Sequence, residues 1–184
     1  VSANMDTTGL FSVAAELQKH QMITCMQKFY STRDYAEAWN DGVDPEYVAV
    51  TCGSTDNSFD LLKRKMDTNS GTKLICIDVA NGYREVFLDF VKRVRNEFPS
   101  SIIIAGNVAT REMTEALILA GADIVKVGIG PGSVCTTRKV AGVGYPQLSA
   151  IAECADAAHG LAGHVMADGG CSSPGDVAKA FAAG

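Results

Sequence analysis

One short segment of the chain combines residue types that can carry out covalent chemistry. It reads Gly128-Ile129-Gly130-Pro131-Gly132-Ser133-Val134-Cys135-Thr136-Thr137-Arg138. Its glycines allow a tight backbone that can turn N–H or C=O groups toward a ligand. Cys135 stands between hydroxyl side chains, and a nearby cation such as Arg138 together with N–H donors favours the reactive thiolate. The segment therefore predicts a loop that presents Cys135 as a nucleophile.

The remaining cysteines and the histidines do not form the pattern of a zinc site or a disulfide framework. No two of the six cysteines make a C-x-x-C pair, and the three histidines lack ligand spacing. We expect Cys25, Cys76 and Cys154 to be unpaired core residues, as in proteins of reducing compartments. This cysteine usage predicts a cytoplasmic protein.

Composition and charge disfavour two broad classes of protein. Hydrophobic residues make up 47% of the chain and charged residues 20%, with a net charge of −5. A nucleic-acid-binding protein is expected to carry a basic face, and the acidic balance argues against one. No apolar run approaches the roughly 18 residues that a membrane span needs. A soluble globular domain that acts on a small molecule is favoured.

Short apolar runs alternate with amphipathic segments along the whole sequence. The runs are too short for helices and are rich in β-branched residues, which predicts buried parallel strands. They are Val1–Met5, Met22–Met26, Tyr47–Thr51, Leu74–Val79, Ile102–Ala105, Ile124–Val127 and His164–Ala167. The segments between them predict helices, because their apolar residues recur at helical spacing. Examples are Leu10/Val13/Ala14/Leu17, Val86/Phe87/Phe90/Val91/Val94/Phe98 and Met113/Ala116/Leu117/Ala120.

Helix boundaries are also visible in the sequence. Ser31 with Asp34 fits a capping box, and Thr110 can cap a helix that Gly121 closes. Ser173 followed by Pro174 supplies another N-cap with proline at the first helical position.

Strict βα alternation predicts an α/β fold with a parallel sheet and helices outside it. An open doubly wound sheet is the alternative, but seven similar units favour a (β/α)₈ TIM barrel. The eighth strand is missing from this count. We therefore expect residues 1–184 to be a single catalytic barrel domain that is incomplete.

Polar and glycine residues follow each predicted strand, where the active sites of such barrels lie. These strand ends are Asn4–Asp6, Gln27–Lys28, Cys52–Ser54, Asp78–Gly82, Gly106–Asn107, Gly128–Arg138 and Asp168–Gly170. The repetition at seven strand ends predicts one composite site.

At these strand ends the sequence resembles the IMP dehydrogenase/GMP reductase family. The resemblance rests on the Cys135 loop, on Ala105-Gly106-Asn107-Val108 before it and on Ala167-Asp168-Gly169-Gly170 after it, and runs from Asn4 to Gly184. The amino-acid sequences of three segments resemble the GMP reductase branch of this family, namely Asp78–Tyr83, Gly144–Gln147 and Asp168–Lys179. Lys28 is present, although the histidines that usually flank this lysine are replaced.

The resemblance implies reductive deamination of GMP to IMP and ammonia with NADPH, through a cysteine thioimidate. The alternatives are an IMP dehydrogenase, which oxidises IMP to XMP with NAD, and a non-catalytic nucleotide-binding barrel. The resemblance further implies a homo-oligomer, a tetramer, and an acidic partner of Thr137 on a later segment of the family's chains. No G-x-G-x-x-G fingerprint occurs, so we expect the cofactor to bind barrel loops.

The same resemblance assigns roles to individual residues. The catalytic residues are Cys135 as nucleophile and Thr137 as proton shuttle. The residues that bind GMP are Asp168 at the ribose, Ser133, Gly169 and Gly170 at the phosphate, and Met5 and Asn107. The residues that contact NADPH are Lys28, Asp78, Val79, Ala80, Ile129 and Gly130. A potassium site is implied at Gly130, Gly132, Cys135 and Arg138.

Overall fold

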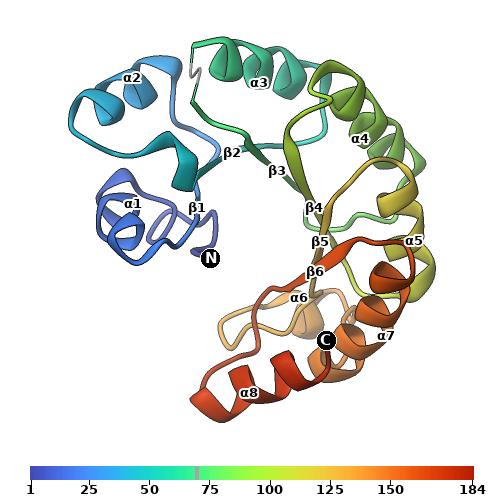
Figure 1. The fold of residues 1–184 in the computed structure, drawn as a ribbon. Helices are drawn as coiled ribbons and strands as arrows, with labels where there is room; N and C mark the ends of the chain where they lie inside the picture. The colour runs from blue at the N-terminus through green and yellow to red at the C-terminus, as the bar shows by residue number, and fades with distance from the viewer. Residues whose placement is uncertain (69–70) are drawn as a thin grey trace. The chain divides into compact units, whose positions relative to one another are not determined.

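The computed structural model describes residues 1–68 and 71–184 (Figure 1). Its backbone contacts divide the chain into two compact units. The first consists of Val1–Asp78 with Phe98–Ile103, and the second of Val79–Glu97 with Ile104–Gly184. Each unit is described by itself.

The first unit is built on three parallel strands in chain order. The strands are β1 (Thr24–Cys25), β2 (Val48–Cys52) and β3 (Leu74–Asp78), and Ala49 of β2 is in register with Cys25 on one side and Leu74 on the other. The helices are α1 (Phe11–Leu17), η1 (Gln18–His20), α2 (Thr32–Asn40), η2 (Pro45–Tyr47) and α3 (Asp56–Thr68). Strands and helices alternate, as the sequence predicts.

Burial explains why these segments adopt their structures. All five residues of β2 are buried, which is typical of a parallel strand covered on both faces. Helix α3 packs on β2 with Phe59 and Leu62, which lie three residues apart on one helix face. The Ser31–Asp34 capping box that begins α2 is confirmed.

The prediction of a full strand at Val1–Met5 is wrong. Only Ser2 pairs, through an isolated parallel bridge to Thr24. Local hydrogen bonds turn the chain immediately afterwards: Ser2 donates to the carbonyl of Thr8, and the Thr8 hydroxyl donates to the carbonyl of Ala3. The described residues therefore form six named strands rather than seven.

The second unit also contains three parallel strands. They are β4 (Ile102–Val108, which belongs to this unit from Ile104), β5 (Ile124–Val127) and β6 (His164–Ala167). Lys126, on β5, is in register with Gly106 of β4 and Met166 of β6, so β5 is the middle strand. The register between β4 and β5 shifts between Gly106 and Val108, and the Gly106–Asn107 peptide bond is cis.

The helices of the second unit follow the expected order. They are α4 (Glu85–Glu97), α5 (Arg111–Leu119), α6 (Thr137–Val140), α7 (Gln147–Gly160) and α8 (Pro174–Ala182). Helix α7 packs on β5 and β6 and lies beside α5 (Figure 1). Helix α4 buries Phe87, Phe90, Val91 and Val94 of its predicted apolar stripe.

The helix ends of this unit confirm most of the predicted signals. Ser173 and Asp176 form a capping box at α8, with Pro174 at the first helical position. Gly121 follows α5 in the left-handed region, at φ 109°. Thr110 is the N-cap of α5, but its side chain makes no capping hydrogen bond there. Its hydroxyl instead accepts a hydrogen bond from Tyr83.

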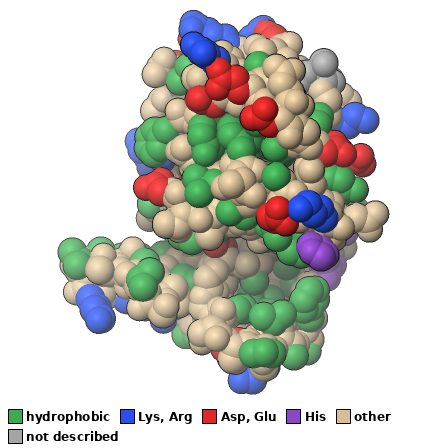
Figure 2. Space-filling model, turned by 90° about the vertical axis from the view of Figure 1, so that its left-hand side faces the viewer, with side chains coloured by type: hydrophobic (Ala, Val, Ile, Leu, Met, Phe, Trp, Pro, Cys, Tyr) green, Lys and Arg blue, Asp and Glu red, His purple; other side chains and the backbone are tan. Residues whose placement is uncertain are grey.

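The surface carries charges of both signs. On the face drawn in Figure 2, acidic and basic side chains are scattered among hydrophobic and neutral ones. Among the described residues, no helix is long and apolar enough to cross a membrane.

Candidate active site

The loop that follows β5 holds Cys135 next to Thr137. The Cys135 thiol donates to Oγ1 of Thr137 at 3.3 Å, and the Cys135 N–H donates to the carbonyl of Gly132 at 3.1 Å. Cys135 is half-buried, whereas Cys25, Cys52, Cys76 and Cys154 are buried and unbridged. Of these five cysteines, Cys135 is therefore the one that a ligand could reach.

Hydrogen bonds from Thr137 lower the pKa of the Cys135 thiol. The side-chain hydroxyl of Thr137 is the largest cause, its backbone N–H is the next, and the charge of Arg138 contributes least. Both groups of Thr137 can donate to a thiolate, which stabilises the charged form. The predicted activation of Cys135 thus comes mainly from Thr137 and only to a small extent from Arg138.

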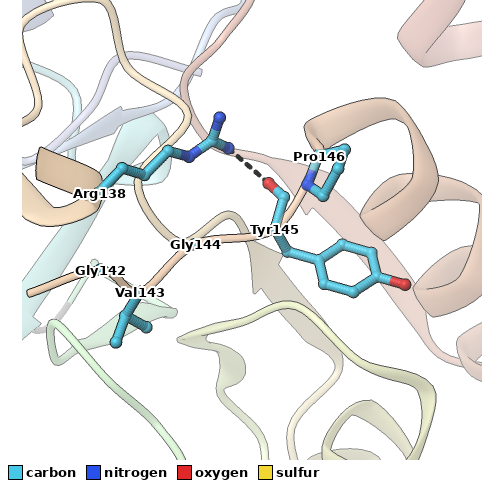
Figure 3. A pocket seen from close by; sticks show the side chains of 6 residues that line it. All are labelled: Arg138, Gly142, Val143, Gly144, Tyr145 and Pro146. Carbon is cyan, nitrogen blue, oxygen red and sulfur yellow. Dashed lines mark hydrogen bonds between the residues drawn. The ribbon is translucent and has the colours of Figure 1, made fainter.

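The guanidinium of Arg138 points toward the backbone of Tyr145 and lines a pocket there. Its Nη2 donates to the carbonyl of Tyr145 at 2.5 Å (Figure 3). The pocket has a volume of about 230 Å³ and is lined by Arg138, Gly142, Val143, Gly144, Tyr145 and Pro146. The arginine links the helix that follows the nucleophile loop to the segment before α7.

The loop after β6 packs against the nucleophile loop. A Cβ added to Gly128 would clash with the carbonyl oxygen of Asp168, and one on Gly170 would lie 3.1 Å from Cβ of Pro131. Gly169 and Gly170 both adopt positive φ, at 81° and 80°, which favours glycine. These glycines bring the predicted phosphate-binding residues close to the Cys135 loop.

Asp168 is the centre of a polar network in this unit. Its Oδ2 accepts hydrogen bonds from Nδ2 of Asn107 at 2.8 Å and from Nζ of Lys126 at 3.2 Å. Asn107 also donates to the carbonyl of Gly128 at 2.9 Å. Hydrogen bonds thus connect Asp168, which is predicted to bind the ribose, with Asn107, which is predicted to bind GMP, and with Gly128 at the start of the Cys135 loop.

Two members of this network were not predicted from the sequence. Lys126 is 6% exposed, and Gln147 donates from Nε2 to the carbonyl oxygens of Val127 and Asp168. A lysine within an apolar strand run was the available signal, because lysine is almost never buried without a partner. Gln147 gave no comparable signal, since a glutamine at a helix start is common on surfaces.

Two buried acceptors in this region have no hydrogen-bond partner among the described residues. They are Oδ1 of Asn107 and Oε1 of Gln147. Buried polar atoms are normally satisfied by protein, water or ligand. The pair marks a place where a ligand or ordered water can donate.

The other predicted site residues are distributed over both units. Ser133 is exposed, and Ile129 is 7% exposed, so any ligand contact of Ile129 would come from its backbone. Ala80 is exposed, whereas the backbone of Val79 is hydrogen-bonded to Gly106 and Asn107.

Three predicted residues belong to the first unit. Met5 is 55% exposed, Asp78 ends β3, and Lys28 is exposed with its ammonium 5.7 Å from the centroid of the Phe29 ring. The carbonyl of Lys28 accepts a hydrogen bond from Nζ of the buried Lys65. The backbone after β1 is therefore anchored while the Lys28 side chain is left accessible.

The residues assigned to bound groups are chemically suited to them. The potassium site would consist of backbone carbonyl oxygens, which are suitable ligands for a large monovalent cation. The Gly132 carbonyl already accepts one hydrogen bond, but a carbonyl oxygen has a second lone pair. The Lys28 side chain is exposed, so its ammonium can meet a phosphate group without rearrangement of a core, and Ala80 of the second unit is exposed as well.

Comparisons with known proteins agree on one family. A family model described as IMP dehydrogenase / GMP reductase domain matches residues 1–184. The chain is 57% identical over 187 residues to a GMP reductase of Caenorhabditis elegans, and 58% identical over 186 residues to one of Phytophthora infestans. It is 56% identical over 185 residues to GMP reductase 2 of Homo sapiens. Each comparison covers 100% of this chain and 51–53% of the relative.

A solved structure extends the similarity to the fold. The chain matches the crystal structure of inosine 5′ monophosphate dehydrogenase from Legionella pneumophila with a TM-score of 0.88 and 34% identity, over 100% of this chain and 54% of the other. The chain thus spans about half the length of the relatives it matches. With the family model matched from the first residue to the last, the chain belongs to the IMP dehydrogenase/GMP reductase family.

Proposed function

We propose that this protein is a GMP reductase, which converts GMP, NADPH and a proton to IMP, ammonia and NADP⁺. The observation that carries the proposal is 55–58% identity to GMP reductases over the whole chain. It is supported by the contact between Cys135 and Thr137, since a nucleophile beside a proton-transfer group is what this chemistry needs. Identity to the dehydrogenase of known structure is lower, at 34%.

Cys135 acts as the nucleophile in this proposal. Carbon 2 of guanine is only a weak electrophile, so a covalent step divides one difficult substitution into two easier ones. The Cys135 thiolate forms an S–C2 bond, and the C2–N bond to the amino group breaks as ammonia leaves. When bound, NADPH supplies the hydride that C2 receives, and the S–C2 bond then breaks to release IMP and restore the thiolate.

Thr137 transfers the proton that the leaving amine requires. Its hydroxyl lies 3.3 Å from the Cys135 sulfur, so it stands close to the carbon that the sulfur attacks. A hydroxyl cannot be the ultimate proton source at neutral pH. An acidic partner, implied by the family resemblance, would complete the relay.

The proposed substrate contacts are those that the family resemblance implies. Asp168 accepts hydrogen bonds from the ribose hydroxyls, and Asn107 and Met5 complete the nucleoside contacts. The exposed Ser133 and the backbone of Gly169 and Gly170 hold the phosphate, since left-handed glycines can turn successive N–H groups toward an anion.

The contacts of the cofactor and the ion also follow the family resemblance. Lys28, Asp78, Val79, Ala80, Ile129 and Gly130 would contact NADPH. The carbonyl oxygens of Gly130, Gly132 and Cys135 would hold potassium at a site that also includes Arg138, and the ion would fix the conformation of the loop. The full domain would be a (β/α)₈ barrel in a cytoplasmic homotetramer.

One pair of assays tests the proposed activity. Purified full-length protein should oxidise NADPH with GMP and release ammonia, and should fail to reduce NAD with IMP. The opposite pattern would identify an IMP dehydrogenase. Absence of both activities, with GMP still bound, would indicate a nucleotide-binding barrel without catalysis.

A further inference from the structure

Lys126 belongs to the hydrogen-bonded network around Asp168, and its side chain is almost fully buried. It lies on the middle strand β5, in register with Gly106 and Met166, and its side chain is 7% exposed. Met166 lies opposite Lys126, and Asp168 follows Met166 by two residues, directly after the end of β6. Because side chains alternate along a strand, the Asp168 side chain lies on the same face of the sheet as that of Lys126. The ion pair between Nζ and Oδ2, at 3.2 Å, is a consequence of this register.

Stability alone does not account for a lysine at this position. A buried ion pair adds little net stability compared with apolar residues of the same volume. The neighbours Ile124, Val125 and Val127 show that β5 otherwise consists of aliphatic residues. A methionine or leucine would fill the same space at lower desolvation cost.

The exposure of the two partners differs in a way that suggests a role. The Asp168 side chain is 31% exposed and can meet a ligand, whereas that of Lys126 is too enclosed to do so. The contact through which Lys126 can influence such a ligand is its ion pair with Asp168. Such a residue positions a binding group without touching the substrate.

The two donors to Asp168 converge on one oxygen atom. Both Asn107 and Lys126 donate to Oδ2, and no described residue is hydrogen-bonded to Oδ1. The carboxylate is thereby fixed in rotation, with Oδ1 left as the acceptor for an incoming hydroxyl pair. A carboxylate held by a single donor would be freer to rotate.

We propose that Lys126 is a positioning residue that orients Asp168 for the ribose hydroxyls of the nucleotide. The inference rests on the proposed function, because it takes GMP as the ligand. It predicts that Lys126 contributes to the recognition of a ribonucleotide but not of a nucleotide that lacks both ribose hydroxyls.

The test compares the binding of GMP and 2′,3′-dideoxy-GMP to the full-length protein by calorimetry. Lys126→Met should weaken GMP binding by about 10- to 100-fold, as expected when a hydrogen bond to a charged group is lost. Binding of the dideoxy nucleotide should change by less than about twofold, because it makes no contact with the carboxylate. A merely structural role would weaken both ligands equally, and that outcome would overturn the inference.

Three further variants make the comparison specific. Lys126→Arg keeps the cation and should retain most of the preference for GMP. Lys65→Met removes the other strongly buried lysine, which contacts Lys28 instead of Asp168, and should leave the preference unchanged. In an Asp168→Asn background, Lys126→Met should cause no further loss of the preference for GMP over the dideoxy nucleotide, since that preference depends on the Asp168 carboxylate.

Each result distinguishes the inference from the proposed function. If the wild-type protein does not bind GMP, the proposed function is wrong and the inference falls with it. If the wild-type protein prefers GMP and Lys126→Met keeps that preference, only the positioning role is wrong. Should Lys126→Met fail to fold, Lys126→Gln decides the matter, since its neutral amide fills much of the same space.

Discussion

At the scale of single residues, the pKa of the Cys135 thiol depends on its neighbour two positions along the chain. Thr137 lowers the pKa of the thiol more than the cation of Arg138 does. The same hydroxyl is the group proposed to deliver a proton to the leaving amine. One side chain would therefore serve both the nucleophile and the leaving group.

Thr137→Ala should raise the pKa of Cys135 and slow turnover. A higher pKa leaves less thiolate at neutral pH, so the midpoint of the pH profile for alkylation of Cys135 by iodoacetamide should move upward. Peptide mass spectrometry gives this profile, and alkylation of the exposed Cys171 in the same samples corrects for differences in reagent activity. Ammonia release should slow by about 10²- to 10⁴-fold, as for loss of a general acid.

Two outcomes would contradict these roles of Thr137. An unchanged alkylation midpoint would show that the hydrogen bond does not activate the thiol. Single-turnover kinetics in which only hydride transfer is slowed would show that Thr137 does not serve the leaving amine.

At the scale of elements, a close approach of β4 and β5 shapes the site. Gly106 stands opposite Lys126, where an added Cβ would lie 2.7 Å from Cβ of Lys126 and would clash with its carbonyl oxygen. Asn107, at the adjacent register shift, reaches Asp168. Irregular pairing of this kind re-aims a side chain next to a site.

Gly106→Ala should therefore destabilise the protein and weaken GMP binding together. The backbone of β5 cannot yield as a flexible side chain would, so the free energy of unfolding should fall by about 1–3 kcal/mol. Gly160→Ala is the matched control, because nothing lies within 4 Å of its added Cβ at the end of α7. It should change stability by less than about 1 kcal/mol, in the stabilising direction. A tolerated Gly106→Ala, measured by urea unfolding and GMP titration, would contradict the described packing.

Local signals were predictable from the sequence, and long-range contacts were not. The capping box at Ser31 depends on a residue three positions away, and the N-cap at Ser173 is followed directly by Pro174, so both helix starts could be recognised from the sequence. The contact of Asn107 with Asp168 joins residues 61 positions apart, and only strand register brings them together. The sequence predicted Ile124–Val127 as a buried strand but gave no role to Lys126, because the partner of its charge, Asp168, lies 42 positions later in the chain.

The nucleophile loop is the element on which the proposed ion would act. If the carbonyl oxygens of Gly130, Gly132 and Cys135 hold potassium, activity should rise as potassium replaces a non-binding organic cation at constant ionic strength. Zinc chelators should have no effect, because the proposed ligands are all oxygen atoms. Equal activity without potassium, after exhaustive dialysis, would remove the proposed site.

At the scale of the whole molecule, helix α8 and one edge of strand β6 in the second unit are exposed in the described chain. No residue of α8 is buried, and Phe181 is 82% exposed. Within the described chain β6 pairs only with β5, and an open parallel edge invites association with other chains. The chain spans about half the length of its relatives.

Residues 1–184 expressed alone should therefore not oxidise NADPH with GMP. A chain extended to the length of the relatives should do so and should melt cooperatively. Light scattering and thermal unfolding of both proteins would accompany the assay. Full activity and a cooperative monomeric melt from the short chain would show that the segment is self-sufficient.

The covalent bond that Cys135 is proposed to form with the nucleotide is tested most directly by one measurement. Cys135→Ala in the full-length protein should bind GMP with nearly unchanged affinity, because the proposed ribose and phosphate contacts are made by other residues. The rate of NADPH oxidation with GMP should nevertheless fall by about 10³-fold or more, since no other group on the loop can replace the thiolate. A rate within about tenfold of the wild-type value would contradict the covalent mechanism.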